Sequence, residues 1–285
     1  MQWTGERMLT NYNMGKGAIE HLHRYSIITD FIKDKVVLDL ASGEGYGTNL
    51  IATHAKYVTG VDISAEAVAH AKEKYRKPNL QFLEGSATNV PLENDAVDVI
   101  VSFETLEHHD QHEAMMVEFK RVLKPGGLLF ISTPEKENYK KIDPVNPFHI
   151  KELTLSEFSD LLNQHFSWFQ LLHQRFFDVS FMYPSDETIG RYEEYSGTFE
   201  SIRKETFAAN YYFNVAVCSD REPDFRLGPS FFNGSDYLRL SQEQLVQYYE
   251  SRIKEVSDQF LHSTSYRIGN LFVRPFSFLK RIFSK

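Results

Sequence analysis

Short apolar runs alternate with segments of helical periodicity over most of this chain, the pattern of a sheet covered by helices on both faces. The runs predict strands at residues 36–39, 57–63, 80–85, 97–103, 127–133, 166–177 and 211–219, and helices at 48–55, 64–75, 111–123 and 155–164. Ser64 and Thr154 are the expected N-caps of two helices, and Glu157 stands at the capping-box position of the second. The order predicts an α/β fold with a doubly wound, mostly parallel seven-stranded sheet.

The same pattern divides the chain into three parts. Residues 1–35 contain an amphipathic helix at about 16–32, which would pack on the sheet edge or form a lid over a ligand. Residues 36–220 form the main domain, with an insert at about 178–210 before the last strand. Residues 221–285 carry a C-terminal helix and a tail. Residues 134–152 hold three prolines and are expected to form a loop.

A glycine-rich stretch follows the first strand, where open α/β sheets bind their ligands. Residues 36–47 read V-V-L-D-L-A-S-G-E-G-Y-G, with Asp39 at the strand end and then Gly43, Gly45 and Gly47. Glycine lets the backbone turn sharply and approach a ligand closely, and the following helix would point its N–H groups at the same ligand. The spacing differs from the G-x-G-x-x-G of dinucleotide-binding proteins. Asp62, at the end of the next strand, is placed to accept hydrogen bonds from ribose hydroxyls.

These residues resemble the first two motifs of the class I S-adenosylmethionine (SAM)-dependent methyltransferases, whose fold is Rossmann-like. The resemblance implies SAM as the cofactor, in preference to a nicotinamide or a flavin. The cofactor-binding residues that it implies are Asp39, Gly43, Gly45, Gly47, Asp62, Ile63, Ser86, Ala87, Phe103 and Arg24. Ser86 stands where the family usually has an Asp facing the adenine, and its hydroxyl can still form a hydrogen bond.

T-G-E-R at residues 4–7 and E-H-L-H-R-Y at 20–25 resemble methyltransferases associated with bacterial surface-polysaccharide biosynthesis, and N-P-F-H-I-K-E at 146–152 resembles a signature of glycan and small-molecule methyltransferases. These resemblances imply O-methylation of a sugar or glycan. If the N-terminal helix forms a lid over the cofactor, Arg7 or Arg24 would meet the methionine carboxylate of SAM. Two alternatives remain open: a methyltransferase of a quinone-like or lipid precursor, and a non-catalytic binding module of the same fold.

Residues 104–112, E-T-L-E-H-H-D-Q-H, follow the fourth strand and should face the reacting methyl group. An oxygen acceptor benefits from a general base, and imidazole titrates in the right range. We predict His108 or His149 as the base, with Glu104 or Glu107 as orienting carboxylates. The pattern does not choose between the two histidines, and a plain polar helix N-terminus is the simpler interpretation.

The same residues raise the question of a metal, because imidazoles and carboxylates ligate divalent ions. The neighbouring His108 and His109 do not share a helix face. No metal site is therefore predicted from the sequence.

Composition narrows the class of protein. The chain has 285 residues, is 42% hydrophobic and carries a net charge of −8, which supports a full core and argues against general nucleic-acid binding. Its one cysteine, Cys218, excludes an intramolecular disulfide. The N-terminus lacks the apolar core of a signal peptide and no apolar run is long enough to span a bilayer. We expect a cytoplasmic protein.

The insert and the C-terminal part carry the remaining predictions. The insert would build the acceptor site or simply form an aromatic core; its candidate residues are Tyr183, Arg191, Tyr192, Tyr195 and Phe199. From about residue 241, Leu245, Tyr249, Ile253, Val256 and Phe260 form one apolar helix stripe, which would pack on the domain or join two copies as a homodimer. Residues 262–285 have five Lys/Arg and no acid, which predicts peripheral membrane or synthase contact; an ordinary packed tail is the alternative.

Overall fold

The computed structural model describes residues 15–177, 179–185, 194–197, 202–205 and 211–269. The chain separates into two compact units, residues 1–234 and 235–285, which are described separately. Residues 221–234 therefore belong with the sheet and not with the C-terminal helix. They include the edge strand β11, which pairs with β7.

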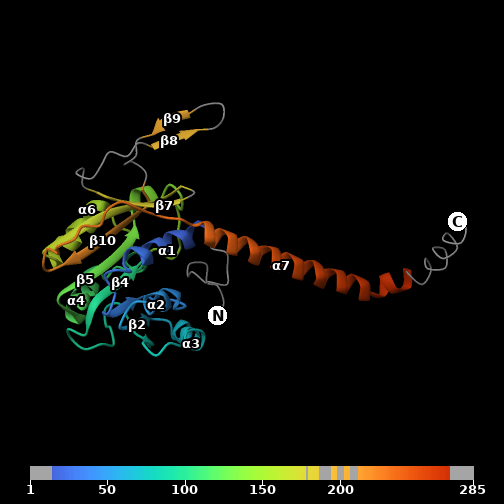
Figure 1. Ribbon diagram of the computed structural model, residues 1–285, viewed down its shortest axis with the longest axis horizontal. Helices are drawn as coiled ribbons and strands as arrows, with labels where there is room; N and C mark the ends of the chain where they lie inside the picture. The colour runs from blue at the N-terminus through green and yellow to red at the C-terminus, as the bar shows by residue number, and fades with distance from the viewer. Residues whose placement is uncertain (1–14, 178, 186–193, 198–201, 206–210, 270–285) are drawn as a thin grey trace, which may run out of the picture. The chain divides into compact units, whose positions relative to one another are not determined.

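The first unit is built on one mixed sheet of nine strands in the order β11-β7-β6-β10-β5-β4-β1-β2-β3 (Figure 1). Seven are the predicted strands: β1 Val36–Leu40, β2 Tyr57–Asp62, β3 Leu80–Glu84, β4 Val97–Phe103, β5 Leu123–Pro134, β6 Trp168–Phe177 and β10 Phe213–Ser219. The strands from β3 to β5 pair in parallel, whereas β10 runs antiparallel to both β5 and β6. The predicted doubly wound α/β fold is confirmed.

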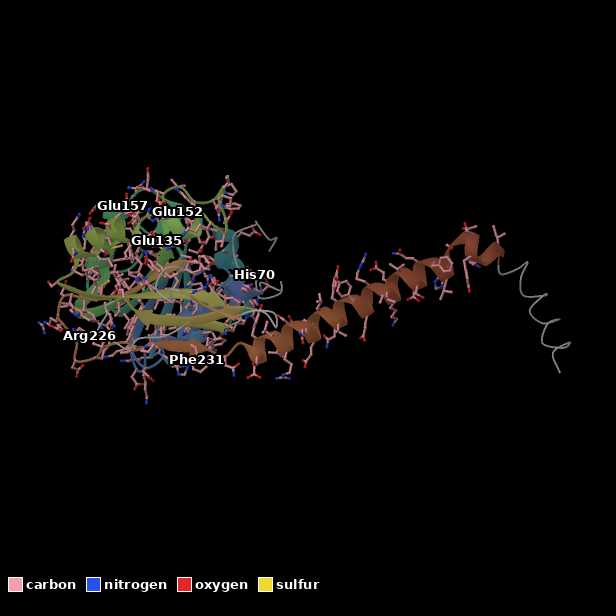
Figure 2. All side chains as sticks on the ribbon, turned by 90° about the horizontal axis from the view of Figure 1, so that it is seen from above. His70, Glu135, Glu152, Glu157, Arg226 and Phe231 are labelled. Atoms are coloured by element: carbon pink, nitrogen blue, oxygen red, sulfur yellow. The ribbon has the colours of Figure 1, made fainter. Side chains whose placement is uncertain are left out.

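Strands outside the predicted seven extend this sheet and form a small second one. β7 Val179–Pro184 and β11 Ser230–Phe232 continue the antiparallel side, and Phe231 of β11 is 69% exposed (Figure 2). β8 Glu194–Gly197 pairs with β9 Ile202–Glu205 as a separate two-stranded sheet. The sequence insert at about 178–210 thus contains three strands, which the prediction described only as an insert.

Helices cover both faces of the main sheet. They are α1 Lys16–Ile27, α2 Tyr46–Ile51, α3 Ala65–Lys74, α4 His112–Val122, α5 Lys136–Tyr139 and α6 Leu155–His165, with a 3-10 turn η1 at Leu106–His108. Apolar residues of α4 and α6 pack together on one core, while the segment after α1 and the residues of α2 pack on a second core across the sheet. This three-layer arrangement of helices, sheet and helices fixes the positions of the strand ends and of the loops that carry the site.

Most predicted boundaries hold within a few residues, and the capping predictions are confirmed. Ser64 accepts a hydrogen bond from the Ala67 amide at 3.3 Å, and Thr154 and Glu157 form a complete capping box at the start of α6. Such caps satisfy backbone donors that the first helical turn leaves unpaired.

Three local predictions were wrong. The first helix ends at Ile27, not near residue 32. The loop over 134–152 contains the short helix α5, which Glu135 caps by accepting from the Asn138 amide. Strand β5 begins at Leu123 and not at the predicted residue 127, and its pairing with β4 is irregular between Val97 and Val99, with Gly126 at a φ of 79°. A periodicity argument misses such features because they depend on single side chains and on strand register.

The second unit contains one long helix, α7 Ser235–His262. It starts before the predicted position of about 241 and carries the predicted stripe, whose side chains are exposed: Leu245, Tyr249, Ile253, Val256 and Phe260. Residues 270–285, most of the basic tail, lie outside the described part of the chain. Among the described residues no helix is both long and apolar enough to cross a membrane.

Candidate functional site

A cavity of about 930 Å³ opens at the carboxyl ends of the parallel strands. Its wall combines α1 with the loops that follow β1, β2, β3 and β4 and with the segment around residues 139–149. The predicted site residues on this wall are Arg24, Gly43, Asp62, Ile63, Ser86, Ala87, Phe103, Glu104, Glu107, His108 and His149. Tertiary structure thus collects residues from four strand ends and two more distant segments into one space, as expected for an open α/β sheet.

The glycine-rich turn is tied to Asp62. One carboxylate oxygen of Asp62 accepts the Gly43 amide at 2.8 Å, and the other accepts the Ser64 amide at 2.9 Å. Asp62 is 6% exposed and lies on the cavity wall. Each carboxylate oxygen has more than one lone pair, so Asp62 can shape the turn and also accept hydrogen bonds from a ligand.

Asp39, Gly45 and Gly47 lie behind the wall and do not line the cavity as the described residues form it. The buried Asp39 carboxylate accepts from Thr48 Oγ1 at 2.6 Å and from the Tyr25 hydroxyl at 3.3 Å, and burial raises its pKa to about 7. A Cβ on Gly47 would stand 2.1 Å from the Tyr25 hydroxyl oxygen. These residues allow the turn and α1 to pack closely, which places Tyr25 on the cavity wall.

The other predicted cofactor residues lie around the rim. Ser86 and Thr88 share a hydrogen bond between their hydroxyls at 3.1 Å, and the Ser86 hydroxyl also accepts the Thr88 amide, which holds the turn after β3. Ile63 is 75% exposed, whereas Phe103 is nearly buried with its ring edge-on to Tyr25. An exposed apolar side chain and a buried aromatic ring that line the same cavity suit a flat ligand ring that is partly enclosed.

Arg24 of α1, which was predicted to bind the cofactor, is fully buried and lies on the cavity wall. Its Nε donates to Gln174 Oε1 at 2.7 Å, and its guanidinium lies 4.4 Å from the Phe213 ring centroid. Nη1 is 3.6 Å from Glu104 Oε1 and has no hydrogen-bond partner among the described residues. A buried cationic donor on the cavity wall favours an anionic group of a ligand.

Glu104 lies directly after β4 and has a φ of 53°, which is unusual for a residue with a side chain. Ser132 Oγ donates to Glu104 Oε1 at 2.6 Å. The carboxylate is therefore held between Ser132 and Arg24. Strain of this kind concentrates at functional sites, where the surrounding structure holds it in place.

Glu107 is 1% exposed and lies on the 3-10 turn η1. Thr133 Oγ1 donates to its Oε2 at 3.1 Å, and its backbone oxygen accepts the amides of Ile150 and Lys151 at 2.7 and 3.1 Å. Burial, reinforced by the charge of Glu104, holds the pKa of Glu107 well above its usual range. The backbone bonds bring the segment that carries His149 against the β4 loop.

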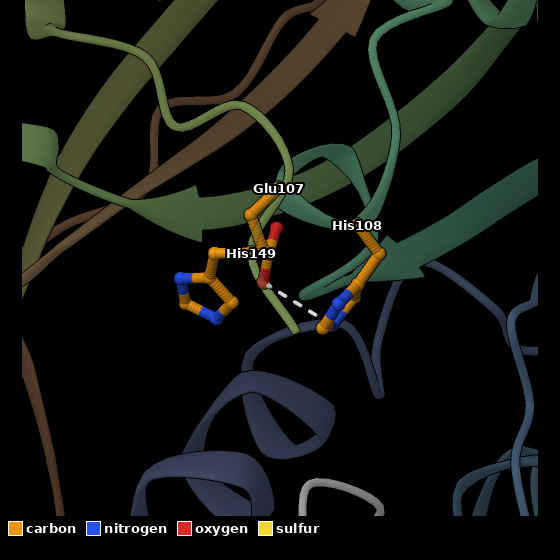
Figure 3. Close-up of side chains that lie close together, drawn as sticks. All are labelled: Glu107, His108 and His149. Carbon is orange, nitrogen blue, oxygen red and sulfur yellow. Dashed lines mark ion pairs between the residues drawn. The ribbon is translucent and has the colours of Figure 1, made fainter. Parts of the chain in front are cut away.

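His108 and His149 face each other beside Glu107 (Figure 3). Their ring centroids are 5.4 Å apart at an interplanar angle of 80°, and His108 Nε2 lies 4.0 Å from Glu107 Oε1. His108 Nδ1 is 3.1 Å from the Phe148 carbonyl oxygen, and His149 Nδ1 is 2.6 Å from Glu152 Oε1. All four residues predicted for catalysis therefore lie on one wall, and three of them form a compact cluster.

Sequence reasoning missed several wall residues. Glu20, His21, Tyr46 and Tyr139 also line the cavity. Tyr46 lies between two glycines of the turn and its hydroxyl is 2.7 Å from His21 Nδ1, while the Tyr139 ring stacks on His149 at 5.4 Å. Tyr46 could have been suspected from its place in the turn; no sequence signal pointed to Tyr139, which belongs to the unpredicted helix α5.

Some candidates cannot be placed. Arg7, Arg191, Tyr192 and Phe199 lie outside the described residues. For Tyr183 and Tyr195 the backbone strands are described and the side chains are not. The acceptor site predicted for the insert therefore stays a prediction.

Comparisons with known proteins agree with this geometry. Residues 38–131 match the family model "Methyltransferase domain". A Mycobacterium tuberculosis protein named "Probable S-adenosylmethionine-dependent methyltransferase" is 38% identical over 162 residues, which cover 56% of this chain and 58% of that protein. A demethylmenaquinone methyltransferase of Chlorobaculum tepidum is 38% identical over 106 residues, which cover 36% of this chain and 42% of the relative. The chain spans about half the length of the curated relatives that it matches first.

Solved structures support the fold. A SAM-dependent methyltransferase of Thermotoga maritima superimposes with a TM-score of 0.52 at 19% identity, over 72% of this chain and 91% of its own. Another, from Mesorhizobium loti, gives 0.51 at 16% identity, over 72% of this chain and its full length. At these identities the likeness concerns the fold, which is that of the class I methyltransferases.

Proposed function

We propose that this protein is a SAM-dependent methyltransferase. The observation that carries the proposal is a single cavity. Its wall includes the glycine-rich turn at Gly43, with the Asp62 carboxylate that binds this turn, and also the cluster of Glu107, His108 and His149. One part of this wall suits a nucleoside and the other suits proton chemistry on an acceptor. The match of residues 38–131 to a methyltransferase domain and the names of the relatives support the same activity.

The residues on the wall fit the groups that SAM presents. Asp62 would accept hydrogen bonds from the ribose hydroxyls, and the turn at Ser86 and Ala87 would meet the adenine. Arg24 Nη1, buried and without a hydrogen-bond partner among the described residues, would take the methionine carboxylate. When bound, SAM supplies an activated methyl group; this chain's residues must align the acceptor with it and exclude water.

For the acceptor we propose a hydroxyl on a sugar or glycan. The resemblance of N-P-F-H-I-K-E at 146–152 to a signature of glycan and small-molecule methyltransferases supports this, and His149 of that motif lies in the cluster. His108 or His149 would take up the hydroxyl proton as a general base, with Glu107 beside them. In both rings the Nδ1 atom faces an oxygen acceptor, so Nε2 is the atom with the lone pair.

A quinone-like or lipid acceptor is the second candidate. It is favoured by relatives named as a demethylmenaquinone methyltransferase and as phthiotriol/phenolphthiotriol dimycocerosates methyltransferases, the latter 29–30% identical over 100–114 residues. Incubating the protein with methyl-labelled SAM and extracts of its native host separates the candidates. Label in the glycan fraction supports the first, label in the lipid fraction supports the second, and no transfer in any fraction would contradict the methyltransferase proposal.

The C-terminal unit would bring the enzyme to a surface where such an acceptor is made. Residues 262–285 combine five Lys/Arg with large apolar side chains, and each base contributes about 1 kcal/mol near an anionic bilayer. We expect the full chain to float with anionic liposomes at low salt and a version ending at Leu261 to remain behind. Equal flotation of both versions, or of neither, would contradict this role.

A further inference from the structure

We propose that Glu107, His108 and His149 bind a divalent metal ion at the acceptor side of the cavity. Each of the three residues offers one ligand atom, and these atoms lie within 4.8 Å of one another. The three side chains converge from the loop after β4 and the loop after α5 (Figure 3). In the sequence the neighbour of His108 is His109, and no local pattern places the distant His149 beside His108 as the second imidazole.

Both imidazoles have an oxygen acceptor at Nδ1, which favours the tautomer with the proton on Nδ1 and a lone pair on Nε2 for a metal. The Phe148 carbonyl oxygen can only accept, so His108 Nδ1, 3.1 Å away, carries the proton. The Glu152 carboxylate fixes the proton of His149 on Nδ1 in the same way, at 2.6 Å. Nε2 is then the ligating atom of each ring. A carbonyl or carboxylate behind a histidine is the usual outer partner of a metal-bound imidazole.

The carboxylate is prepared in a comparable way. Thr133 holds Oε2 of Glu107 at 3.1 Å, while Oε1 is the oxygen that lies toward His108. Glu107 is 1% exposed, and a buried negative charge is costly unless a cation compensates it. The Arg24 guanidinium is directed to Glu104. A bound divalent cation would supply the missing compensation next to Glu107.

The spacing and the donor set indicate the class of ion. Zinc-type ions bind imidazole nitrogen and carboxylate oxygen at about 2.0–2.2 Å, so ligand atoms around one ion stand roughly 3–3.5 Å apart in tetrahedral geometry. The cluster must therefore contract by about 1 Å. His108 has a side chain that is 33% exposed and can rotate to do so. Two imidazoles and one carboxylate suit Zn²⁺, or Co²⁺ in its place, better than Mg²⁺ or Ca²⁺.

Three protein ligands would leave at least one position open toward the cavity, as in catalytic metal sites. This part of the inference rests on the proposed function. An acceptor hydroxyl bound at the open position would have a lowered pKa, and its proton would leave to water. The ion would then replace a direct imidazole base, because each Nε2 would be engaged with it.

The neighbouring histidines of the same loop serve other purposes. His109 Nε2 lies 3.1 Å from Met115 Sδ, and His112 Nε2 lies 2.8 Å from the backbone oxygens of Leu106 and His109. Neither belongs to the cluster. They make His109→Gln a matched local control, and the exposed His54, which does not line the cavity, offers a second one.

Metal binding can be tested without turnover. The full-length protein, stripped with EDTA and dialysed, is titrated with Zn²⁺ by calorimetry and with Co²⁺ by visible absorption. We expect one equivalent with a Co²⁺ spectrum of low coordination number. His108→Ala and His149→Ala should each weaken binding by at least tenfold, whereas His109→Gln and His54→Ala should leave it unchanged. Because Glu107 is buried, Glu107→Gln is read only with a melting curve that shows it folded.

The outcomes separate this inference from the proposed function, since SAM binding is measured by calorimetry on the same metal-free sample. No saturable Zn²⁺ or Co²⁺ binding, or binding that both histidine variants retain, would overturn the metal site even if SAM binds. Metal binding that depends on His108 and His149 in a protein that does not bind SAM would support the site and contradict the methyltransferase proposal.

Discussion

Asp62 offers the sharpest test of the cavity, because the structure gives its carboxylate two tasks. Both oxygens already accept backbone amides, from Gly43 at 2.8 Å and from Ser64 at 2.9 Å. In the proposed complex the same oxygens would also accept the ribose hydroxyls. Asp62→Ala removes both sets of bonds, whereas Asp62→Asn replaces one acceptor oxygen by a donor that would oppose an amide of the turn.

The expected loss follows from these contacts. A hydrogen bond to a charged group contributes about 1.5–3 kcal/mol, so losing even one ribose bond should raise the Kd for SAM by about 10- to 150-fold in Asp62→Ala. Asp62→Asn should also lose at least about tenfold, since its amide cannot satisfy both backbone donors. Calorimetry with SAM and with its demethylated product measures both changes.

Asp39→Asn is the matched control. Sequence motifs place Asp39 and Asp62 together as cofactor residues, but Asp39 lies behind the cavity wall and its partners are the hydroxyls of Thr48 and Tyr25. A hydroxyl can also accept a hydrogen bond, so an amide is tolerated there and the affinity for SAM should change by only a few-fold. Wild-type affinity in Asp62→Ala would remove Asp62 from the site. An Asp39→Asn loss as large as that of Asp62→Ala would refute the division between them.

Three further predictions concern stability. Burial lowers the pKa of His23 from 6.5 to about 4 in the folded protein. As the pH drops, the unfolded chain therefore takes up a proton on this histidine before the folded chain does. The free energy of unfolding should fall between pH 6.5 and pH 4, by up to about 3 kcal/mol from His23. His23→Gln should flatten that slope in denaturant titrations at several pH values, and an unchanged slope would contradict it. Gly47→Ala should destabilise the fold and displace Tyr25, because the new Cβ would stand 2.1 Å from its hydroxyl oxygen; a melting temperature equal to wild type would count against this packing. Thr154→Ala should cost about 1 kcal/mol through the lost N-cap of α6, and a denaturant midpoint that does not move would show the cap to be dispensable.

The sequence by itself determined seven strands of the main sheet, most of the helices and their order along the chain. Alternating or continuous runs of apolar residues identified all seven strands of the predicted sheet, because the residues of a buried strand are themselves apolar. The N-caps Ser64 and Thr154 could also be predicted, because a cap depends only on a side chain and the backbone amides of the next few residues. The rule that ligands bind at the carboxyl ends of parallel strands then pointed to the edge of the sheet where the cavity lies.

Tertiary structure alone decided which candidate residues line one cavity. The sequence left Arg7 and Arg24 as equal candidates for the carboxylate of SAM, and only packing against Gln174 and Phe213 shows that Arg24 is buried on the cavity wall. His149 comes from a proline-rich loop whose path no periodicity predicts. The backbone of Glu107 binds that loop and brings His149 beside His108. Periodicity predicts which face of a helix or strand is buried in the core. The position of a loop depends instead on hydrogen bonds to residues far away in the chain.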